Sequence, residues 1–456
     1  MNDFINVKNF KKTFLIMFFS MLAVFIVCLC SFFPGVGMND GLNILRSETE
    51  LTSQFSVFYV YFILFLHNIS DALTGGDQLT IALYSVIQLT LTAFILTIIT
   101  VWTCKKNVPV FVKWCTYCFY LFHPIIAIYS IAMIRDTLFA CSMVMIVILT
   151  YDIITRSRSV KKKSFWILYA FSIAGTAVLR SNGIFIIVPF LIVLLIAVKK
   201  TRKNTAIIFG IVIGVTVISS FLKSNERGDM FQEKVGIPLQ QIAVVVKNDG
   251  VISDDDREFI NKIMPEDKIK EKYNPRTSDP IKWSNDFNRT YLDDHKRRFV
   301  KTWFNIFRDN PGICLNAWVQ CTYYFMLPVQ EGTVQTFFTI EDVADNTWLV
   351  DFLKERGIHD RPLIGEKINN VIRKYYYLSK YFLREGVLFW MTIASLIVYR
   401  VRSKNRKAVI IYLPFILLWL TMILSTPIAF SMRYVFAYVI ALFPVTLGLA
   451  LIKNKH

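Results

Sequence analysis

The sequence predicts an all-α polytopic membrane protein in which about ten helices cross the bilayer. Three observations lead to this fold class: 54% of the 456 residues are hydrophobic, only 18% are charged, and the mean hydropathy is +0.46. The apolar residues gather in runs long enough to cross about 30 Å of hydrocarbon. These runs cover residues 13–33, 79–103, 110–134, 137–155, 164–180, 184–198, 205–222, 383–399, 408–425 and 434–452.

This composition excludes a soluble globular enzyme, a disordered chain and a disulfide-stabilised scaffold. The eight cysteines are spread thinly, and several lie inside apolar runs. The net charge of +18 would suit a protein that binds nucleic acid. However, acidic and basic side chains are balanced between residues 223 and 380, so the excess positive charge belongs to the membrane part. We therefore expect no nucleic-acid partner.

Clusters of Lys and Arg predict which helix ends face the cytoplasm, because cytoplasmic loops collect positive charge. Their positions place both chain termini inside. No small-residue cleavage pattern follows the first apolar run, so we expect a retained first span rather than a signal peptide. The composition and the low disulfide potential favour a bacterial plasma membrane. The clusters lie at residues 8–12, 105–113, 156–163, 199–203, 400–407 and 453–455.

One apolar segment, residues 55–66, does not fit as a span, because a crossing there would place Lys105 and Lys106 outside. We expect a helix at the outer interface, where its tyrosines can keep one end of each ring in water. The first outer loop then comprises residues 34–78 and belongs to an N-terminal transmembrane module of residues 1–222.

The long polar stretch of residues 223–382 predicts one extracytoplasmic, mainly α domain, after which residues 383–456 return to the membrane. Ser253 followed by three aspartates is a typical helix start. Asn310-Pro311 opens a second, apolar helix, which we expect to rest on the membrane.

Five basic residues of the membrane part fall outside the cytoplasmic clusters, and all five are arginines near the outer face. The planar guanidinium group binds phosphate oxygens through paired hydrogen bonds and loses its water more easily than an ammonium group does. An all-arginine set therefore favours a phosphate site, although any one arginine could instead reach toward lipid headgroups. The five are Arg46, Arg135, Arg180, Arg384 and Arg433.

Most acidic residues of the membrane part fall on the same side, so carboxylates and arginines are expected to meet at one surface. Asp136 adjoins Arg135 at the start of a helix, and Asp40 lies in a loop whose glycines let the backbone approach a ligand. Alone, Asp136 could be a helix N-terminal charge and Asp40 a turn residue. Their convergence with the arginines makes both candidate catalytic residues.

The sequence contains no motif for binding a nucleotide. Neither GxxxxGK[ST] nor a GxGxxG after a strand occurs, and no sizeable cytoplasmic domain is expected. An outward-facing enzyme without access to a nucleotide could use a substrate already activated on a lipid phosphate.

Several short motifs occur in an order that resembles a known family. They are Pro34-Gly35 with Asp40 in the first outer loop, LYSVIQ at residues 83–88, His123-Pro124 ahead of Ile134-Arg135-Asp136, Leu179-Arg180-Ser181-Asn182-Gly183, Asn310-Pro311-Gly312 and Met432-Arg433-Tyr434. Over most of the chain, this order resembles bacterial members of the C-type (GT-C) membrane glycosyltransferases.

The resemblance implies a GT-C-like fold, a polyprenyl-phosphate-linked sugar as donor, and a glycan or glycolipid as acceptor. It also implies that Asp40 is a general base or metal ligand and that Asp136 is a second acid of the site. Arg135-Asp136 stands where a Lys-Asp pair is usual, and the first outer loop has no obvious pair of adjacent acids. A divalent cation, Mg²⁺ or Mn²⁺, is therefore an open alternative.

The chemistry of glycosyl transfer leads to the same roles. The acceptor hydroxyl must lose a proton, which we assign to Asp40, and charge on the phosphate leaving group must be stabilised. Direct attack with one base would invert the anomeric centre. We expect Arg180 and Arg433 to clamp the lipid phosphate, with Arg135 as a further candidate. The remaining expected binding residues are Arg46, Asn182, Arg384 and Tyr434.

Two other functions use similar features. A polysaccharide polymerase or ligase would act outside on glycans carried by polyprenyl pyrophosphate. A transporter or flippase for lipid-linked sugar is expected to carry ionisable groups near the bilayer midplane and to show inverted repeats. In this sequence the ionisable groups gather near one face instead, which favours an enzyme.

Overall fold

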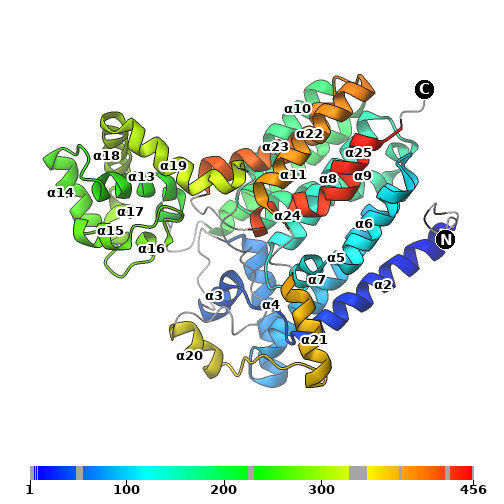
Figure 1. Cartoon of the computed structure of the whole chain (residues 1–456), viewed down its shortest axis with the longest axis horizontal. Coiled ribbons are helices and arrows are strands. Elements are labelled where there is room, and N and C mark those ends of the chain that lie inside the picture. The colour runs from blue at the N-terminus through cyan, green and yellow to red at the C-terminus, as the bar shows by residue number, and fades with distance from the viewer. Residues whose placement is uncertain are drawn as a thin grey trace.

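The computed structural model consists of a large helical bundle and a smaller helical lobe beside it (Figure 1). It describes residues 5, 7, 9–47, 55–223, 231–327, 347–378, 383–426 and 432–453, and every regular element within these ranges is a helix. The prediction of an all-α chain is thus confirmed for the part of the chain that the structure describes.

Eight helices in the described ranges are long and apolar enough to cross a membrane. Such a set indicates a multi-pass membrane protein, as the composition predicted. The eight are α2 (Phe10–Ser31), α4 (Val57–Thr74), α5 (Gln78–Lys105), α8 (Asp136–Ile154), α11 (Arg202–Lys223), α22 (Glu385–Ser403), α23 (Ala408–Ser425) and the stretch that joins α24 (Met432–Ala441) to α25 (Gly448–Leu451).

Three of the ten predicted spans differ from a simple crossing. The run at 110–134 is broken into α6 (Val110–Phe122) and α7 (Pro124–Ile131), which are bent by 50° because Pro124 has no N–H to continue the helix. Two other runs form shorter apolar helices, α9 (Lys163–Leu179) with 17 residues and α10 (Gly183–Ala197) with 15. The predicted number of spans is therefore met only in part.

Helix α4 contains the segment that was predicted to lie at the interface, yet its length and hydropathy would allow it to span. Its neighbours decide where it lies. The Lys105 ammonium is 4.1 Å from the centre of the Phe10 ring, so α2 begins and α5 ends at the same end of the bundle. The segment between the end of α2 and the start of α5 therefore begins and ends at the opposite end of the bundle. Only Gly75, Gly76 and Asp77 separate α4 from α5, so α4 ends where α5 starts. The start of α4 lies at that end too, because the Tyr59 hydroxyl donates to the Met133 carbonyl at 3.1 Å.

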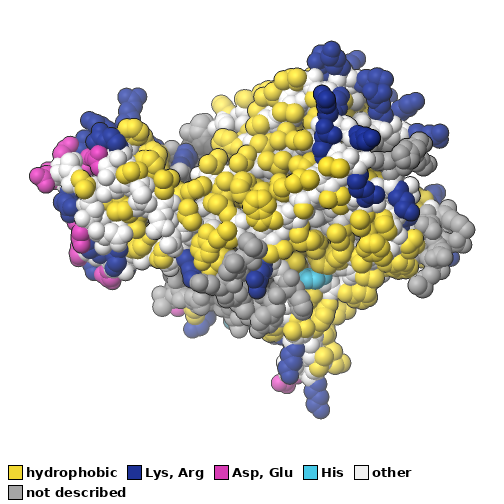
Figure 2. Space-filling view, turned by 45° about the horizontal axis from the view of Figure 1, so that its top comes forward, with side chains coloured by type: hydrophobic (Ala, Val, Ile, Leu, Met, Phe, Trp, Pro, Cys, Tyr) yellow, Lys and Arg dark blue, Asp and Glu magenta, His cyan; other side chains and the backbone are white. Residues whose placement is uncertain are grey.

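Lys and Arg side chains gather at one end of the bundle, above a broad apolar surface (Figure 2). We call this end the basic end and the opposite end, where α2 finishes and α5 starts, the site end. The basic end is formed by residues 105–106, 156–163, 199–203, 400–407 and 453.

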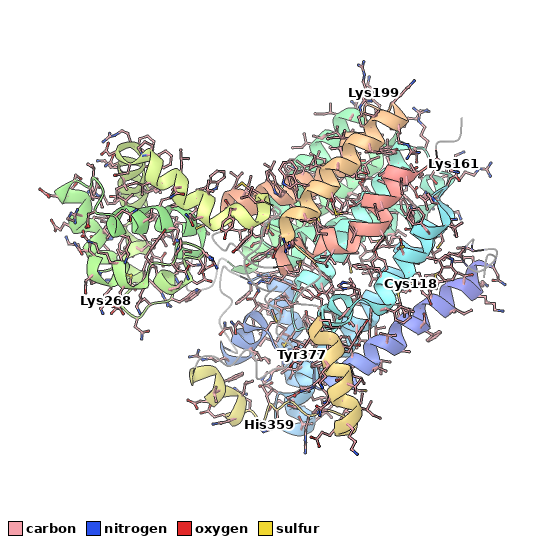
Figure 3. The ribbon with its side chains drawn as sticks, viewed as in Figure 1. Cys118, Lys161, Lys199, Lys268, His359 and Tyr377 are labelled. Atoms are coloured by element: carbon pink, nitrogen blue, oxygen red, sulfur yellow. The ribbon has the colours of Figure 1, made fainter. Side chains whose placement is uncertain are left out.

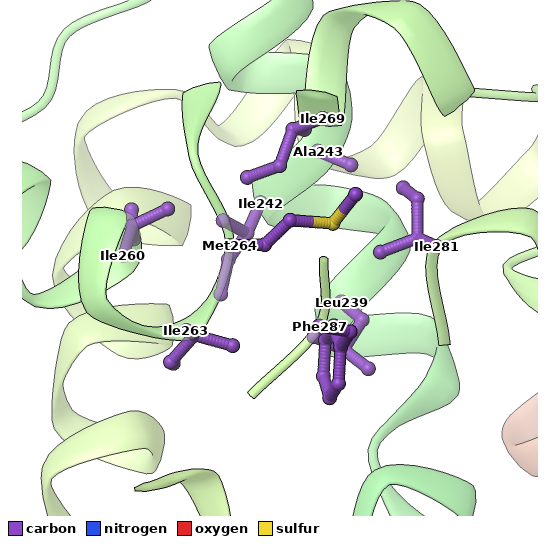
Figure 4. Close-up of a pocket in the computed structure, with 9 residues that line it drawn as sticks. All are labelled: Leu239, Ile242, Ala243, Ile260, Ile263, Met264, Ile269, Ile281 and Phe287. Carbon is purple, nitrogen blue, oxygen red and sulfur yellow. The ribbon is translucent and has the colours of Figure 1, made fainter. Parts of the chain in front are cut away.

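The smaller lobe has a hydrophobic core of its own, made by short helices that precede and include the first half of α19 (Pro311–Met326). The predicted helix start is confirmed, because the Ser253 hydroxyl accepts a hydrogen bond from the Asp256 N–H at 3.3 Å. The helices are α12 (Phe231–Lys234), α13 (Gly236–Lys247), α14 (Asp254–Ile263), α15 (Glu266–Lys272), α16 (Asp279–Lys282), α17 (Arg289–Asp294) and α18 (Lys296–Asp309). Nine apolar residues line a pocket in this core, with no charged or hydrogen-bonding side chain among them (Figure 4).

The stretch predicted as one domain, residues 223–382, divides between two places in the structure. Its first part forms the lobe, whereas α20 (Thr347–Glu355) shares a core with α3 (Asn39–Ser47) and α4 at the site end. Helix α21 (Glu366–Tyr377) packs against α2 and α7 instead (Figures 1 and 3). Sequence polarity could not separate these parts, because all of them lie outside the apolar runs. Helix α19 links the lobe to α22 and α23.

Candidate functional site

The loop between α2 and α3 is paired with the junction between α7 and α8. The Val36 N–H donates to the Ile131 carbonyl at 3.2 Å, and the Met133 N–H donates to the Val36 carbonyl at 2.9 Å. Gly35 has a φ of +138°, and a β-carbon there would overlap the Ser85 hydroxyl. This pairing brings the first turn of α3, with Asp40, beside the start of α8.

Two polar side chains of α5 hold this junction in place. The Gln88 amide nitrogen donates to the carbonyls of Tyr129 and Ala132, at 3.1 and 2.5 Å, and the Ser85 hydroxyl donates to the Ile131 carbonyl at 2.9 Å. All of these groups are buried, so an unmade bond would leave a carbonyl without a partner. The LYSVIQ motif thus has a structural role in placing the site.

We expect Gln88→Leu to destabilise the protein by about 1–3 kcal/mol, because buried carbonyls lose their donor. Thermal unfolding in detergent measures this change. Thr90→Val is the matched control, since the Thr90 hydroxyl donates to the Val86 carbonyl of its own helix. Equal unfolding temperatures for the Gln88→Leu and Thr90→Val proteins would contradict the role assigned to Gln88.

Asp40 lies between two arginines. Its Oδ2 atom is 3.5 Å from Arg433 Nη1 and 3.7 Å from Arg135 Nη2. Burial by itself would raise the pKa of the Asp40 carboxyl. The charges of the arginines, led by that of Arg433, outweigh burial and hold this pKa below its usual value of 3.8. Asp40 is therefore a carboxylate at neutral pH, and its side chain is 15% exposed.

Asp136, the first residue of α8, forms an ion pair with Arg180. The Asp136 side chain is only 2% exposed, so this pair is shielded from water. Arg180 Nε also donates to the Asn182 side chain at 3.2 Å, and the Asn182 amide donates to the Thr421 hydroxyl at 3.4 Å. The connection between α9 and α10 is thus tied to α8 by the Arg180 guanidinium and to α23 by the Asn182 amide.

Aromatic rings flank the three guanidinium groups. Tyr434 lies beside two of them, with its ring centre 4.5 Å from Arg180 and 4.8 Å from Arg433, and its hydroxyl accepts from Arg433 Nη2 at 2.8 Å. The Arg135 guanidinium lies 5.2 Å from the Phe55 ring centre and 5.6 Å from that of Tyr59. Its buried Nε and Nη1 atoms have no hydrogen-bond partner among the described residues. Such rings hold a cation in place while leaving its in-plane donors available.

We call these residues the arginine cluster: Asp40, Arg135, Asp136, Arg180, Arg433 and Tyr434. Its three guanidinium groups face two carboxylates, so the cluster itself, counted over these described residues, carries one positive charge in excess. An excess of guanidinium donors in a partly dry site is suited to a bound anion, above all to a phosphate group.

The donor set does not fit a divalent cation. Across the described ranges, no three His, Cys, Asp or Glu side chains converge as metal ligands. Asp40 and Asp136 each face at least one arginine already, so a metal ion would approach guanidinium charges. We therefore derive no step through Mg²⁺ or Mn²⁺.

A family model described as a family of unknown function, DUF6020, matches residues 45–456. The chain belongs to this family. The matched region contains four members of the arginine cluster that carry charge, whereas Asp40 lies just before it. No curated protein and no solved structure matches the chain.

The structure brings together some of the predicted site residues but not all. Both aspartates, three of the five arginines, Asn182 and Tyr434 meet at the site end. Arg46 lies in the last turn of α3 and Arg384 precedes α22, and both residues are exposed at the surface. Sequence reasoning missed Phe55 and Tyr59 as neighbours of Arg135. Their aromatic character at the start of α4 was visible, but the contact depends on tertiary folding.

Proposed function

We propose that the chain is a membrane glycosyltransferase, which moves a sugar from a polyprenyl-phosphate donor to a glycan or glycolipid acceptor. The observation that carries this proposal is the arginine cluster: a partly exposed carboxylate, Asp40, held beside an excess of guanidinium groups. A carboxylate base next to a phosphate-binding group is what glycosyl transfer from a lipid phosphate requires.

The positions of the charges support an outward-facing site. The basic end is expected to face the cytoplasm by the positive-inside rule, and the arginine cluster lies at the other end. We propose that the site opens on the extracytoplasmic face of a bacterial plasma membrane. A polyprenyl donor would present its phosphate at this level, with its tail among the apolar helices.

Each arginine has a distinct part in the proposed phosphate site. Arg135 offers two donors that have no partner among the described residues, and Arg433 is the most exposed of the three, at 23%. Arg180 is oriented by Asp136 and by the Tyr434 ring. We propose that Arg135 and Arg433 bind the phosphate oxygens directly. Arg180 would stabilise the negative charge of the phosphate electrostatically, without direct contact. This arrangement would stabilise negative charge as the phosphate departs.

The proposed reaction is a single displacement. The oxygen of the acceptor hydroxyl forms a bond to the anomeric carbon as the bond between that carbon and the phosphate oxygen breaks. The hydroxyl proton passes to a carboxylate oxygen of Asp40, and the bonding electron pair leaves with the polyprenyl phosphate. One displacement with one base inverts the anomeric centre.

Asp40 is a better candidate for the base than Asp136. Its side chain is 15% exposed, whereas that of Asp136 is 2% exposed and engaged by Arg180. An acceptor hydroxyl can therefore approach Asp40, and we propose that Asp136 acts by orienting Arg180. This division revises the sequence prediction, in which both aspartates were catalytic.

The low pKa of Asp40 predicts the pH dependence of transfer. The active form is the carboxylate, so activity should fall only as the pH drops through a pKa that lies below 3.8. We expect kcat/KM to show no acid limb between about pH 5 and pH 8. An acid limb with an apparent pKa well above 5, not shared by unfolding of the protein, would exclude Asp40 in this environment as the base.

A transfer assay tests the proposed function. Purified protein would be given radiolabelled sugars on synthetic polyprenyl monophosphate, with extracted envelope glycan and glycolipid as acceptors. We expect label in the acceptor fraction and release of polyprenyl phosphate. Transfer from polyprenyl-pyrophosphate oligosaccharides alone would support the polymerase or ligase instead. Movement of labelled lipid across proteoliposomes without a new glycosidic bond would support the transporter or flippase.

A further inference from the structure

Helix α21 presents a row of large apolar side chains that no other part of the described structure covers. Ile368, Val371, Tyr375 and Leu378 are exposed by 62%, 69%, 42% and 44%. Their spacing of three, four and three residues places them along one side of the helix. Four exposed apolar side chains in one row are unusual for a surface in water.

A second side of α21 is anchored to the protein. Asn369 and Tyr376 are buried, and the Tyr376 ring packs on the Phe32 ring with centres 5.7 Å apart. Arg373 Nη2 donates to the Ser31 carbonyl at 2.8 Å. These contacts fix the helix against the last turn of α2, so the direction in which the apolar row points is set by the fold.

The third side of α21 is polar and exposed, with Glu366, Lys367, Asn370 and Lys374. On a helical projection the two lysines fall next to the apolar row, between it and the rest of the polar side. A helix with separate protein-facing, apolar and polar sides is suited to lie in the plane of a membrane surface. Lysines at the border can extend toward headgroups while their carbon chains stay near the apolar side.

The position of α21 in the fold agrees with such a surface. It crosses the site end of α2 rather than running beside it (Figure 1). Helix α2 exposes apolar side chains as far as Ile26 and Val27, each 44% exposed, within about one turn of its contact with α21. The apolar row of α21 therefore lies close to the surface of α2 that would face lipid.

We propose that α21 is an interfacial helix whose apolar row sits in the lipid leaflet at the site end, with Lys367 and Lys374 at the level of the headgroups. The occupant of this surface is membrane lipid, because the row lies close to the exposed apolar side chains of α2 and is bordered by cations that suit lipid phosphates. The inference does not depend on the proposed function.

This anchor is connected to the loop that carries Asp40. The segment before α21 holds that loop through its backbone: the Arg361 N–H donates to the Phe33 carbonyl at 2.7 Å, and the Leu363 N–H donates to the Cys30 carbonyl at 2.8 Å. Together with the Arg373 bond to Ser31, these contacts attach both α21 and the start of the loop to the end of α2. Contact of α21 with lipid would thus fix how far the loop between α2 and α3, which leads to Asp40, lies from the lipid headgroups.

Site-specific photocrosslinking of the full chain tests this proposal. Benzoylphenylalanine would replace Val371 in the apolar row, Asn370 on the polar side, or Phe19 on the exposed face of α2, in separate proteins. Each protein would be placed in nanodiscs of phosphatidylethanolamine and phosphatidylglycerol, irradiated and digested. Mass spectrometry would then detect lipid adducts. Elution as a single peak in size exclusion would select the folded proteins.

We expect lipid adducts at position 371 and at the positive control, position 19. We expect none at position 370. A second row position, Ile368, would replace Val371 if that variant did not fold, with the same expectation. Three outcomes would overturn the proposal: adducts at position 19 without any in the row, equal adducts at positions 370 and 371, or a crosslink from the row to a second copy of the chain.

Discussion

Replacement of Asp40 by Asn should abolish sugar transfer while the protein remains folded. The amide has nearly the same shape as the carboxylate but cannot accept the proton of the acceptor hydroxyl, and the loss of a general base typically lowers a rate by about 10² to 10⁴-fold. The same change removes the negative charge between Arg135 and Arg433, so donor binding should be kept or strengthened. The measurement is kcat and KM for transfer from the polyprenyl-phosphate donor.

Asp71→Asn is the matched control for this experiment. Asp71 is an exposed acid in the last turn of α4, at the same end of the bundle and outside the arginine cluster. We expect wild-type rates for this variant. Full activity of a correctly folded Asp40→Asn protein would move the base to another residue, and equal losses in both variants would indicate a general effect of charge at this surface.

The second large effect concerns the ion pair between Arg180 and Asp136. Arg180→Gln leaves the Asp136 carboxylate in a site where its side chain is only 2% exposed. Removal of one partner of a buried pair costs about 3–5 kcal/mol, because a charge stays buried without compensation. We expect a correspondingly lower unfolding temperature. The double variant Arg180→Gln with Asp136→Asn should recover much of this loss, since neither buried group is then charged.

Thermal unfolding in one detergent, with Arg158→Gln as a control, measures these differences. Arg158 is an exposed residue of the basic end, and its replacement should change the unfolding temperature little. The ion pair would have no role in stability if Arg180→Gln unfolded like Arg158→Gln. A double variant no more stable than the single one would show that Asp136 is not left uncompensated by the loss of Arg180.

Hydropathy and charge predicted the parts of the fold and site that depend on local sequence. Apolar runs of membrane length became helices because backbone groups in lipid must bond within their own segment. The sidedness of the arginines placed Arg135, Arg180 and Arg433 near the two aspartates before any contact was known. The break at His123-Pro124 departs from the single span predicted at 110–134, and the missing N–H of proline explains it.

Contacts between distant segments could not be predicted in this way. In the sequence, Gln88 is simply a polar residue in an apolar run. Only the folded chain shows that its amide donates hydrogen bonds to carbonyls at the junction of α7 and α8. Likewise, polarity assigned α20 and α21 to the same domain as the lobe, although Phe352 and Leu353 of α20 and Tyr376 of α21 pack at the site end. Composition describes the average polarity of a segment. The positions of α20 and α21 and the role of Gln88 depend instead on contacts between individual side chains.

Binding of polyprenyl phosphate tests the central claim, that the arginine cluster holds a lipid phosphate, most directly. Native mass spectrometry of the purified protein would compare retention of polyprenyl phosphate with retention of polyprenol, which has the same tail and no charge. We expect the wild type to retain the phosphate in preference to the alcohol and the folded Arg433→Gln protein to lose that preference. Equal retention of both lipids by the wild type, or an unchanged preference in the variant, would contradict the account.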